Sequence, residues 1–212
     1  GTIYSLDDLA ALAEVCAREG VVVLSDEIYG LVTFAGGPAP SMASLLPSQT
    51  IMTIGLSKAF AAGGWRLGLA AVPDALGTLL PPLRAMISET FSAVSAPIQY
   101  GALPAFEFGT EIEAFVETTT AIHCAASTYL FERIQASELL CPRPEGAFYL
   151  FPDFEPYRES LAARGITTGT GLAQALLNEA GVATLPGEDF GLPPESLTLR
   201  IASVDYDGAE VL

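Results

Sequence analysis

The sequence predicts an α/β fold built around an open, mainly parallel sheet. The segments VVVLS (21–25) and TIMTIGLS (50–57) are apolar runs without alternation, which is typical of parallel strands covered on both faces. WRLGLAAVP (65–73) reads as a third strand of the same kind. A helical segment precedes the first strand, and short links join the rest, as expected for an α/β sheet.

The first element is an amphipathic helix over residues 6–19. Ser5 to Asp8 resembles a capping box, and Gly20 provides a stop signal. Apolar residues recur at helical spacing between these signals, at Leu6, Leu9, Leu12, Val15 and Cys16. This helix therefore leads directly into the first strand.

The remaining elements follow in order along the chain. Residues 76–106 read as helix, polar break and helix, and residues 109–137 read as one long helix without proline or internal glycine. Strands and a helix then alternate, in the order GAFYLF (146–151), the helix 171–180, VATL (182–185) and LTLRIAS (197–203). This pattern predicts a smaller α+β region at the C-terminal end.

Composition excludes several classes of function. The net charge is −16 and no basic cluster is present, which argues against a nucleic-acid partner. Glycines and prolines interrupt the uncharged segment 28–57, so we expect no membrane span. The three cysteines and the single histidine form no disulfide framework and no metal site, and adjacent residues such as His123 and Cys124 point in different directions on a helix.

Reactive side chains follow two of the predicted strands. Asp26 and Tyr29 come after VVVLS, Lys58 comes after TIMTIGLS, and Arg66 lies in the next loop. Because ligands of open α/β sheets gather at the carboxyl ends of the strands, we expect these groups to line one cleft. Lys58 is the only lysine in the chain. A solvated lysine at a strand end is the alternative, whereas a carboxylate, a phenol, an amine and a guanidinium together fit pyridoxal phosphate.

The motifs SDEIYG (25–30) and GLSKAFAAGGWRLG (55–68) resemble those of the class I/II aminotransferases, which are fold type I pyridoxal-phosphate enzymes. PEGAFYLFPDF (144–154), VATLPGEDFG (182–191) and LTLRIASV (197–204) resemble segments of the small domain of this family. The resemblance implies a remainder of the large cofactor domain over 1–120 and a small α+β domain over 121–212, with the boundary inside the long helix.

The resemblance also implies a role for each candidate residue. Lys58 would form the Schiff base with pyridoxal 5'-phosphate and would move a proton at the substrate Cα. Asp26 would pair with the pyridine nitrogen, and Tyr29 would hydrogen-bond the ring oxygen. Arg66 would bind the phosphate, and Arg200 would bind the α-carboxylate of the substrate.

Two features depart from the family pattern. Gly55 stands where many relatives have a serine that binds the phosphate. The glycine-rich phosphate loop and the stacking aromatic residue of the family precede this region in relatives. We therefore expect a C-terminal portion of a longer enzyme, inactive by itself and a cytoplasmic homodimer when complete, unless a leader upstream of Gly1 directs import into an organelle.

The expected activity is transfer of an amino group between an L-amino acid, aspartate-like or aromatic, and a 2-oxo acid. The lysine motif specifies the cofactor and leaves the fate of the substrate carbanion open. Two alternatives therefore stay: a pyridoxal-phosphate lyase of the same fold, and a catalytically incompetent fragment or ligand-sensing domain.

Overall fold

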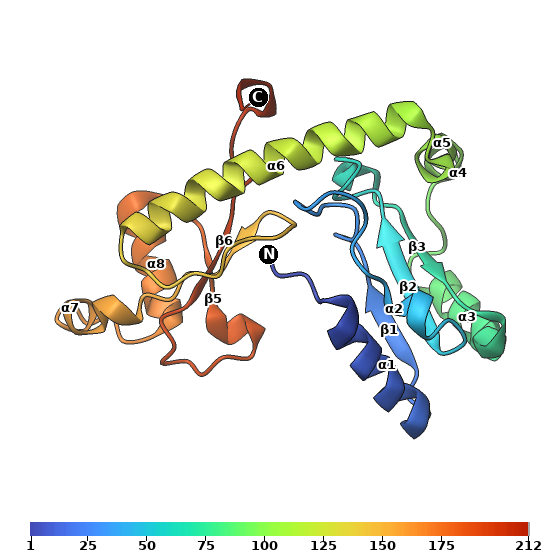
Figure 1. Cartoon of the computed structure of the whole chain (residues 1–212), viewed down its shortest axis with the longest axis horizontal. Coiled ribbons are helices and arrows are strands. Elements are labelled where there is room, and N and C mark those ends of the chain that lie inside the picture. The colour runs from blue at the N-terminus through green and yellow to red at the C-terminus, as the bar shows by residue number, and fades with distance from the viewer. Residues whose placement is uncertain (212) are drawn as a thin grey trace. The chain divides into compact units, whose positions relative to one another are not determined.

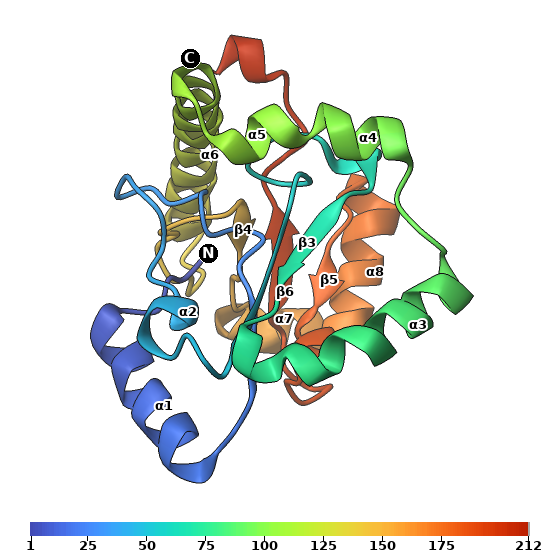
Figure 2. The same cartoon turned by 90° about the vertical axis from the view of Figure 1, so that its right-hand side faces the viewer.

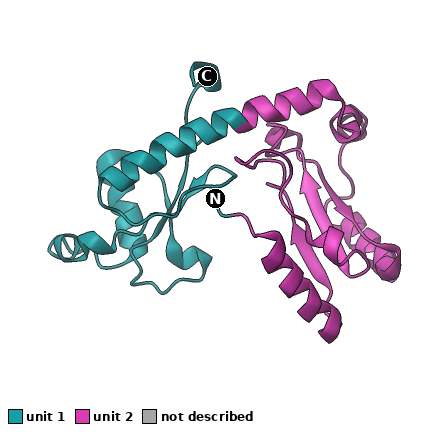
Figure 3. Ribbon diagram, in the orientation of Figure 1, with its two compact units in different colours: residues 1–2, 121–212 teal, residues 3–120 magenta. Residues whose placement is uncertain are grey.

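A computed structural model describes residues 1–211. The chain divides into two units: Figures 1 and 2 show the chain from two directions, and Figure 3 colours the units. Unit 2 contains residues 3–120, and unit 1 contains residues 1–2 and 121–212. Helix α6 (Thr110–Ala136) begins in unit 2 and ends in unit 1. Each unit is described by itself.

Unit 2 contains a three-stranded sheet in the order β1-β2-β3 (Figure 1). Strands β1 (Val23–Asp26) and β2 (Thr50–Gly55) are parallel. Strand β3 (Gly68–Ala71) is antiparallel to β2, so the prediction of a third parallel strand is wrong. The connector 56–67 contains one 3-10 turn, η1 (Gly63–Trp65), and no α-helix that could carry the chain back to the opposite edge of the sheet.

Helices α1 (Leu6–Glu19) and α2 (Met42–Leu45) pack against each other in unit 2. The predicted bounds of α1 are confirmed, because its end signals are local. The Ser5 hydroxyl accepts a hydrogen bond from the Asp8 amide, and Gly20 ends the helix in the left-handed conformation. Their shared core consists of Leu9, Ala13, Met42 and Leu46.

The strands of this sheet are less covered than the sequence predicts. Leu24 in β1 is 69% exposed and Leu69 in β3 is 42% exposed, so the expectation that both faces are buried is wrong for the described residues. β1 and β3 are the two edge strands of this three-stranded sheet. Apolar runs therefore identify the strands correctly but overestimate their burial.

Short helices connect β3 to α6. The chain passes through η2 (Asp74–Leu79), α3 (Leu80–Thr90), α4 (Ala96–Gly101) and α5 (Leu103–Glu107) (Figure 2). The predicted helix, break and helix over 76–106 is thus confirmed, with the second helix divided near Ala102. Among residues 1–211, no helix is long and apolar enough to cross a membrane.

Unit 1 contains a second small sheet, with the order β4-β6-β5 and antiparallel pairs. Its strands are β4 (Tyr149–Leu150), β5 (Leu185–Pro186) and β6 (Leu199–Ala202), and its further helices are α7 (Arg158–Ala162) and α8 (Gly169–Ala180). Leu197 and Leu199 are fully buried at its centre. They pack with Leu161, Ile166 and Leu172, so burial of the leucine side of β6 fixes the face on which Arg200 emerges.

Candidate active site

Lys58 lies beyond the carboxyl end of β2 and close to Tyr29. Its Nζ atom is 5.6 Å from the centroid of the Tyr29 ring. The buried neighbours Leu56 and Ala59 fix the backbone on both sides of Lys58. A turn after β1 carries Tyr29, since the Gly30 amide donates to the Glu27 carbonyl at 2.8 Å. Parallel pairing of β1 and β2 therefore brings the amine and the phenol to one edge.

Asp26 is the last residue of β1 and lies opposite Thr53. Its Oδ1 atom accepts hydrogen bonds from the Thr53 hydroxyl at 3.4 Å and from the Ile28 amide at 3.3 Å. The carboxylate is exposed at the strand end, and these contacts orient it there. The arrangement can present a negative charge to a cationic nitrogen of a ligand at this edge.

Arg66 reaches the same edge because β3 runs antiparallel. It lies two residues before the start of β3, and the start of an antiparallel strand lies beside the end of its partner. A parallel third strand would have placed this residue at the opposite edge of the sheet. Arg66 has a positive φ of 54°, and its Nη1 atom donates to the Gly63 carbonyl at 2.9 Å. This rare conformation for a non-glycine residue is of the kind that clusters at functional sites.

Gly55 is buried at the end of β2, where its surroundings leave little room. A Cβ atom at this position would lie 3.1 Å from the Ile28 Cδ1 atom and 3.1 Å from the Leu67 carbonyl oxygen. A serine here would have to displace the backbone of the connector or the Ile28 side chain. The packing therefore accounts for glycine at the position where the sequence departs from the family pattern.

We expect Gly55→Ala to lower the free energy of unfolding by about 1–3 kcal/mol, the range for overpacking. Gly77→Ala is the matched control, because Gly77 has open space around its Cβ position and no positive φ. Urea unfolding of both variants gives the comparison. Equal midpoints for the two variants would contradict the packing argument.

Glu27 has a structural role that the sequence did not reveal. Its Oε1 atom accepts hydrogen bonds from the Ser25 hydroxyl at 2.9 Å and from the Ser41 hydroxyl at 2.6 Å. Ser41 also caps α2. Glu27 therefore ties the loop after Tyr29 back to β1. The only signal in the sequence was the acidic pair Asp26–Glu27 at the end of the strand. It pointed to Asp26 as a site residue and did not indicate a structural role for Glu27.

A cavity of about 720 Å³ lies beside Glu27. It is mostly apolar, and its lining includes Ile28, Met52, Ile54 and Phe60. Side chains alternate between the faces of a strand, so Glu27 and Met52 lie on the face opposite Asp26 and Thr53. The cavity therefore belongs to the other face of the sheet.

Arg200 lies in unit 1, where its surroundings are aromatic. The guanidinium carbon is 4.4 Å from the Tyr149 ring centroid and 4.5 Å from the Phe190 ring centroid. The structure thus brings Asp26, Tyr29 and Lys58, with Arg66, to one edge of the unit 2 sheet, and it places Arg200 on β6 of unit 1.

His123, the only histidine, makes a separate contact in unit 1. Its Nδ1 atom lies 2.8 Å from the Tyr206 hydroxyl oxygen. Burial lowers the pKa of the His123 imidazole and raises the pKa of the Tyr206 phenol, so the folded unit favours the neutral form of both. Among residues 1–211, no cluster of three or more histidine, cysteine or acidic residues could hold a metal ion.

Comparison with known proteins gives consistent matches over the whole chain. A family model described as aminotransferase class I and II matches residues 1–212. The aspartate aminotransferase of Geobacillus stearothermophilus is 36% identical over 208 residues, which are 97% of this chain and 51% of that protein. The aspartate aminotransferase of Bacillus subtilis is 32% identical over 206 residues, covering 96% of this chain and 50% of that protein.

Solved structures give the same result. Aspartate aminotransferase from Thermus thermophilus with maleate matches with a TM-score of 0.83 at 28% identity, over 99% of this chain and 50% of that chain. An aromatic aminotransferase from Pyrococcus horikoshii OT3 matches with a TM-score of 0.83 at 26% identity, over 99% of this chain and 53% of that chain. The chain therefore spans about half the length of the relatives that it matches.

Proposed function

Because the chain belongs to the class I and II aminotransferase family, we propose that it is part of a pyridoxal-phosphate-dependent transaminase. This enzyme transfers an amino group between an L-amino acid and a 2-oxo acid. The observation that carries this proposal is the placement of Lys58 beside Tyr29 at the sheet edge that also holds Asp26. The relatives named above are aminotransferases, which favours amino transfer over the lyase alternative.

The residues at this edge fit the cofactor by their chemistry. When bound, pyridoxal phosphate supplies an electron sink for negative charge that develops at the substrate Cα. The Lys58 amine would hold the cofactor at its aldehyde carbon, and once free it would hold and move the proton at the substrate Cα. The oriented carboxylate of Asp26 would pair with the ring nitrogen and favour its protonated form.

Two further side chains complete the proposed contacts with the cofactor. The Tyr29 hydroxyl would donate a hydrogen bond to the ring oxygen. The Arg66 guanidinium would bind phosphate oxygens, for which its planar fork of donors is suited. We propose that unit 2 belongs to the large cofactor-binding domain of the enzyme and that unit 1 is its small domain.

We propose that Arg200 binds the α-carboxylate of the substrate. The names of the relatives support aspartate-like or aromatic L-amino acids as the substrates and a matching 2-oxo acid as the acceptor. We also propose that the complete enzyme is a homodimer.

A half-reaction assay tests this function. We expect the enzyme that contains this chain, loaded with cofactor, to convert L-aspartate or L-phenylalanine into its 2-oxo acid in one turnover, and to need a 2-oxo acid acceptor for the next. Release of ammonia or carbon dioxide without an acceptor would instead identify a lyase.

A pair of aspartate variants makes the assay specific for the site. We expect Asp26→Asn to lower the half-reaction rate by about a hundredfold to a thousandfold, as for loss of one preorganised electrostatic contact. Asp74→Asn, at the exposed start of η2, should leave the rate unchanged. Equal rates for the two variants would remove Asp26 from the proposed site.

A further inference from the structure

We propose that Tyr149 and Phe190 are positioning residues that hold the Arg200 guanidinium between their rings and thereby select planar carboxylates over spherical anions. This inference rests on the proposed role of Arg200 in the transaminase. Both rings lie close to the guanidinium carbon, at 4.4 Å and 4.5 Å from their centroids. Distances below about 6 Å are those of favourable cation–π contacts.

The sheet of unit 1 places Tyr149 beside Arg200. Tyr149 in β4 lies opposite Ala202 in β6, and Arg200 precedes Ala202 by two residues, so the three side chains share one face of the sheet. A diagonal neighbour of this kind is within reach of an aromatic or long side chain. The pairing register of β4 and β6 therefore places the Tyr149 ring beside the Arg200 side chain.

The loop after β5 supplies the second ring. Leu185 in β5 lies opposite Arg200, and the 3-10 turn η4 (Gly187–Phe190) follows at once. This turn lies close against β6, because the Gly187 amide donates to the Thr198 carbonyl at 2.8 Å. A Cβ atom on Gly187 would lie 2.9 Å from the Leu192 Cδ1 atom and 3.2 Å from the Thr198 carbonyl oxygen. Glycine there permits the approach that brings Phe190 over Arg200.

Further aromatic side chains support the stack at both ends. Phe151 contacts the Phe190 ring edge-on, with centroids 5.7 Å apart. Phe148 packs on Tyr149 at 4.8 Å, and His123 packs on Phe148 at 5.1 Å. These contacts restrict the rotation of both rings that face Arg200.

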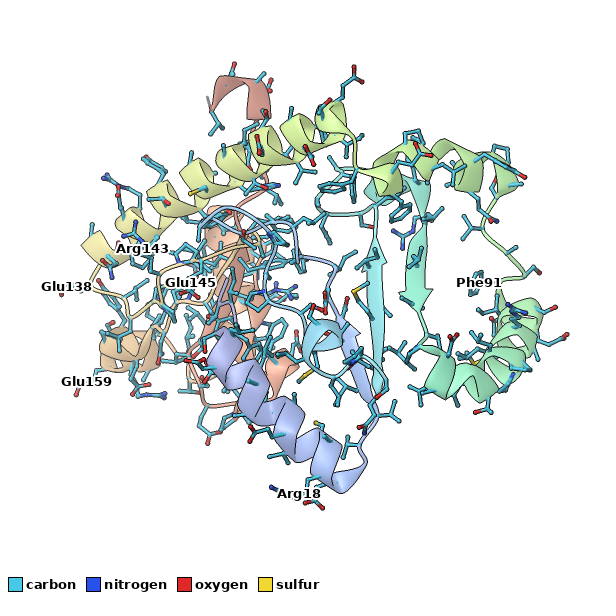
Figure 4. The ribbon with its side chains drawn as sticks, turned by 45° about the vertical axis from the view of Figure 1, so that its right-hand side comes forward. Arg18, Phe91, Glu138, Arg143, Glu145 and Glu159 are labelled. Carbon is cyan, nitrogen blue, oxygen red and sulfur yellow. The ribbon has the colours of Figure 1, made fainter. Side chains whose placement is uncertain are left out.

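In this proposal, the donors along the edge of the Arg200 guanidinium bind the external ligand. Three other arginines pair with glutamates, in Arg18–Glu19, Arg158–Glu155 and Arg164–Glu179 (Arg18 is labelled in Figure 4). Within the described residues of unit 1, Arg200 has no carboxylate partner of this kind. The guanidinium donors lie in its plane, and rings stacked on its two faces, as proposed, would take up none of them.

This geometry gives the site its selectivity. A carboxylate can bind in the plane of the guanidinium through two parallel hydrogen bonds, and the fixed plane lowers the loss of side-chain entropy on binding. A chloride ion gains nothing from a fixed plane, because it has no orientation. The stack should therefore raise the affinity for carboxylates and leave that for chloride unchanged.

Titration of the Arg200 side chain tests the inference without cofactor turnover. In protein with ¹⁵N-labelled arginine Nε atoms, the Arg200 signal is assigned by its loss in Arg200→Lys, and maleate or sodium chloride is then added at matched ionic strength. We expect Phe190→Leu and Tyr149→Leu each to weaken maleate binding about three- to tenfold. Chloride binding should not change, and Phe190→Tyr and Tyr149→Phe should bind maleate as the unsubstituted protein does.

Tyr129→Leu is the matched control, since the Tyr129 ring stacks on a different arginine, Arg133, at 5.4 Å. Leucine variants that keep full maleate affinity would overturn the inference while leaving the proposed function in place. A lack of any Arg200 response to maleate in the unsubstituted protein would overturn the proposed role of Arg200 itself. The stack is also tested without substitution: an Arg200 Nε–H signal without a ring-current shift would show that the rings do not enclose the guanidinium.

Discussion

Replacing Lys58 by alanine should abolish covalent cofactor attachment and reduce the transamination rate of the active enzyme by at least about a thousandfold. Loss of a positioned proton-transfer group alone costs about 10²–10⁴ in rate, and the nucleophilic amine is lost as well. Residues 1–212 contain no second lysine. The measurement is the half-reaction rate, together with the absorbance of bound cofactor.

Peptide mapping gives an independent result for Lys58. Borohydride treatment of the loaded enzyme should fix the cofactor to this residue, and trypsin should then fail to cleave there. Peptides 19–58 and 59–66 would be replaced by one labelled peptide, 19–66. Arg84→Ala serves as the control with unchanged labelling. Recovery of the cofactor on another peptide of an active enzyme would refute the assignment of Lys58.

Replacing Arg200 by lysine should weaken the binding of amino and 2-oxo acids by about 2–4 kcal/mol, or about thirtyfold to a thousandfold. Lysine keeps the charge but loses the planar fork that binds a carboxylate through two hydrogen bonds. It also has no flat group to stack on the Tyr149 and Phe190 rings, whose centroids lie 4.4 Å and 4.5 Å from the Arg200 guanidinium carbon. Substrate affinity, measured by titration of the loaded enzyme, gives the size of the effect.

The control for this variant is Arg143→Lys (Arg143 is labelled in Figure 4). Arg143 also stacks on an aromatic ring, that of Phe131 at 5.8 Å, but it has no proposed role in binding. Its replacement should leave substrate affinity unchanged, and cofactor affinity should survive in both variants. Unchanged affinity of Arg200→Lys for both substrates would exclude Arg200 from carboxylate recognition.

The fold elements were most predictable where their signals are local. Helix α1 has the predicted bounds because Ser5 and Gly20 act on the turns next to them. The direction of β3 was not predictable in this way. Strand direction depends on whether the connector can carry the chain back to the opposite edge of the sheet. An apolar run such as LGLAA (67–71) has the same pattern in a parallel and in an antiparallel strand. Burial of Leu24 was also overestimated, since burial depends on segments that cover the strand.

In the candidate site, too, residues with local sequence signals were predictable and contacts between distant segments were not. Asp26, Tyr29 and Lys58 could be named from short motifs at strand ends, and the parallel pair β1–β2 places them together. The aromatic neighbours of Arg200 could not be named, because Tyr149 and Phe190 reach it through a diagonal strand pair and a turn. Such contacts depend on the pairing register, which leaves no pattern in the neighbouring sequence.

The reversal of β3 also affects the entropy of assembling this edge. The connector 27–49 between β1 and β2 is about twice as long as the connector 56–67 between β2 and β3, so closing it costs about 0.6 kcal/mol more. The shorter loop holds both Lys58 and Arg66. Pairing of β2 with β3 therefore constrains these two cations through a local contact of low sequence separation, whereas Asp26 and Tyr29 join them through a more distant one.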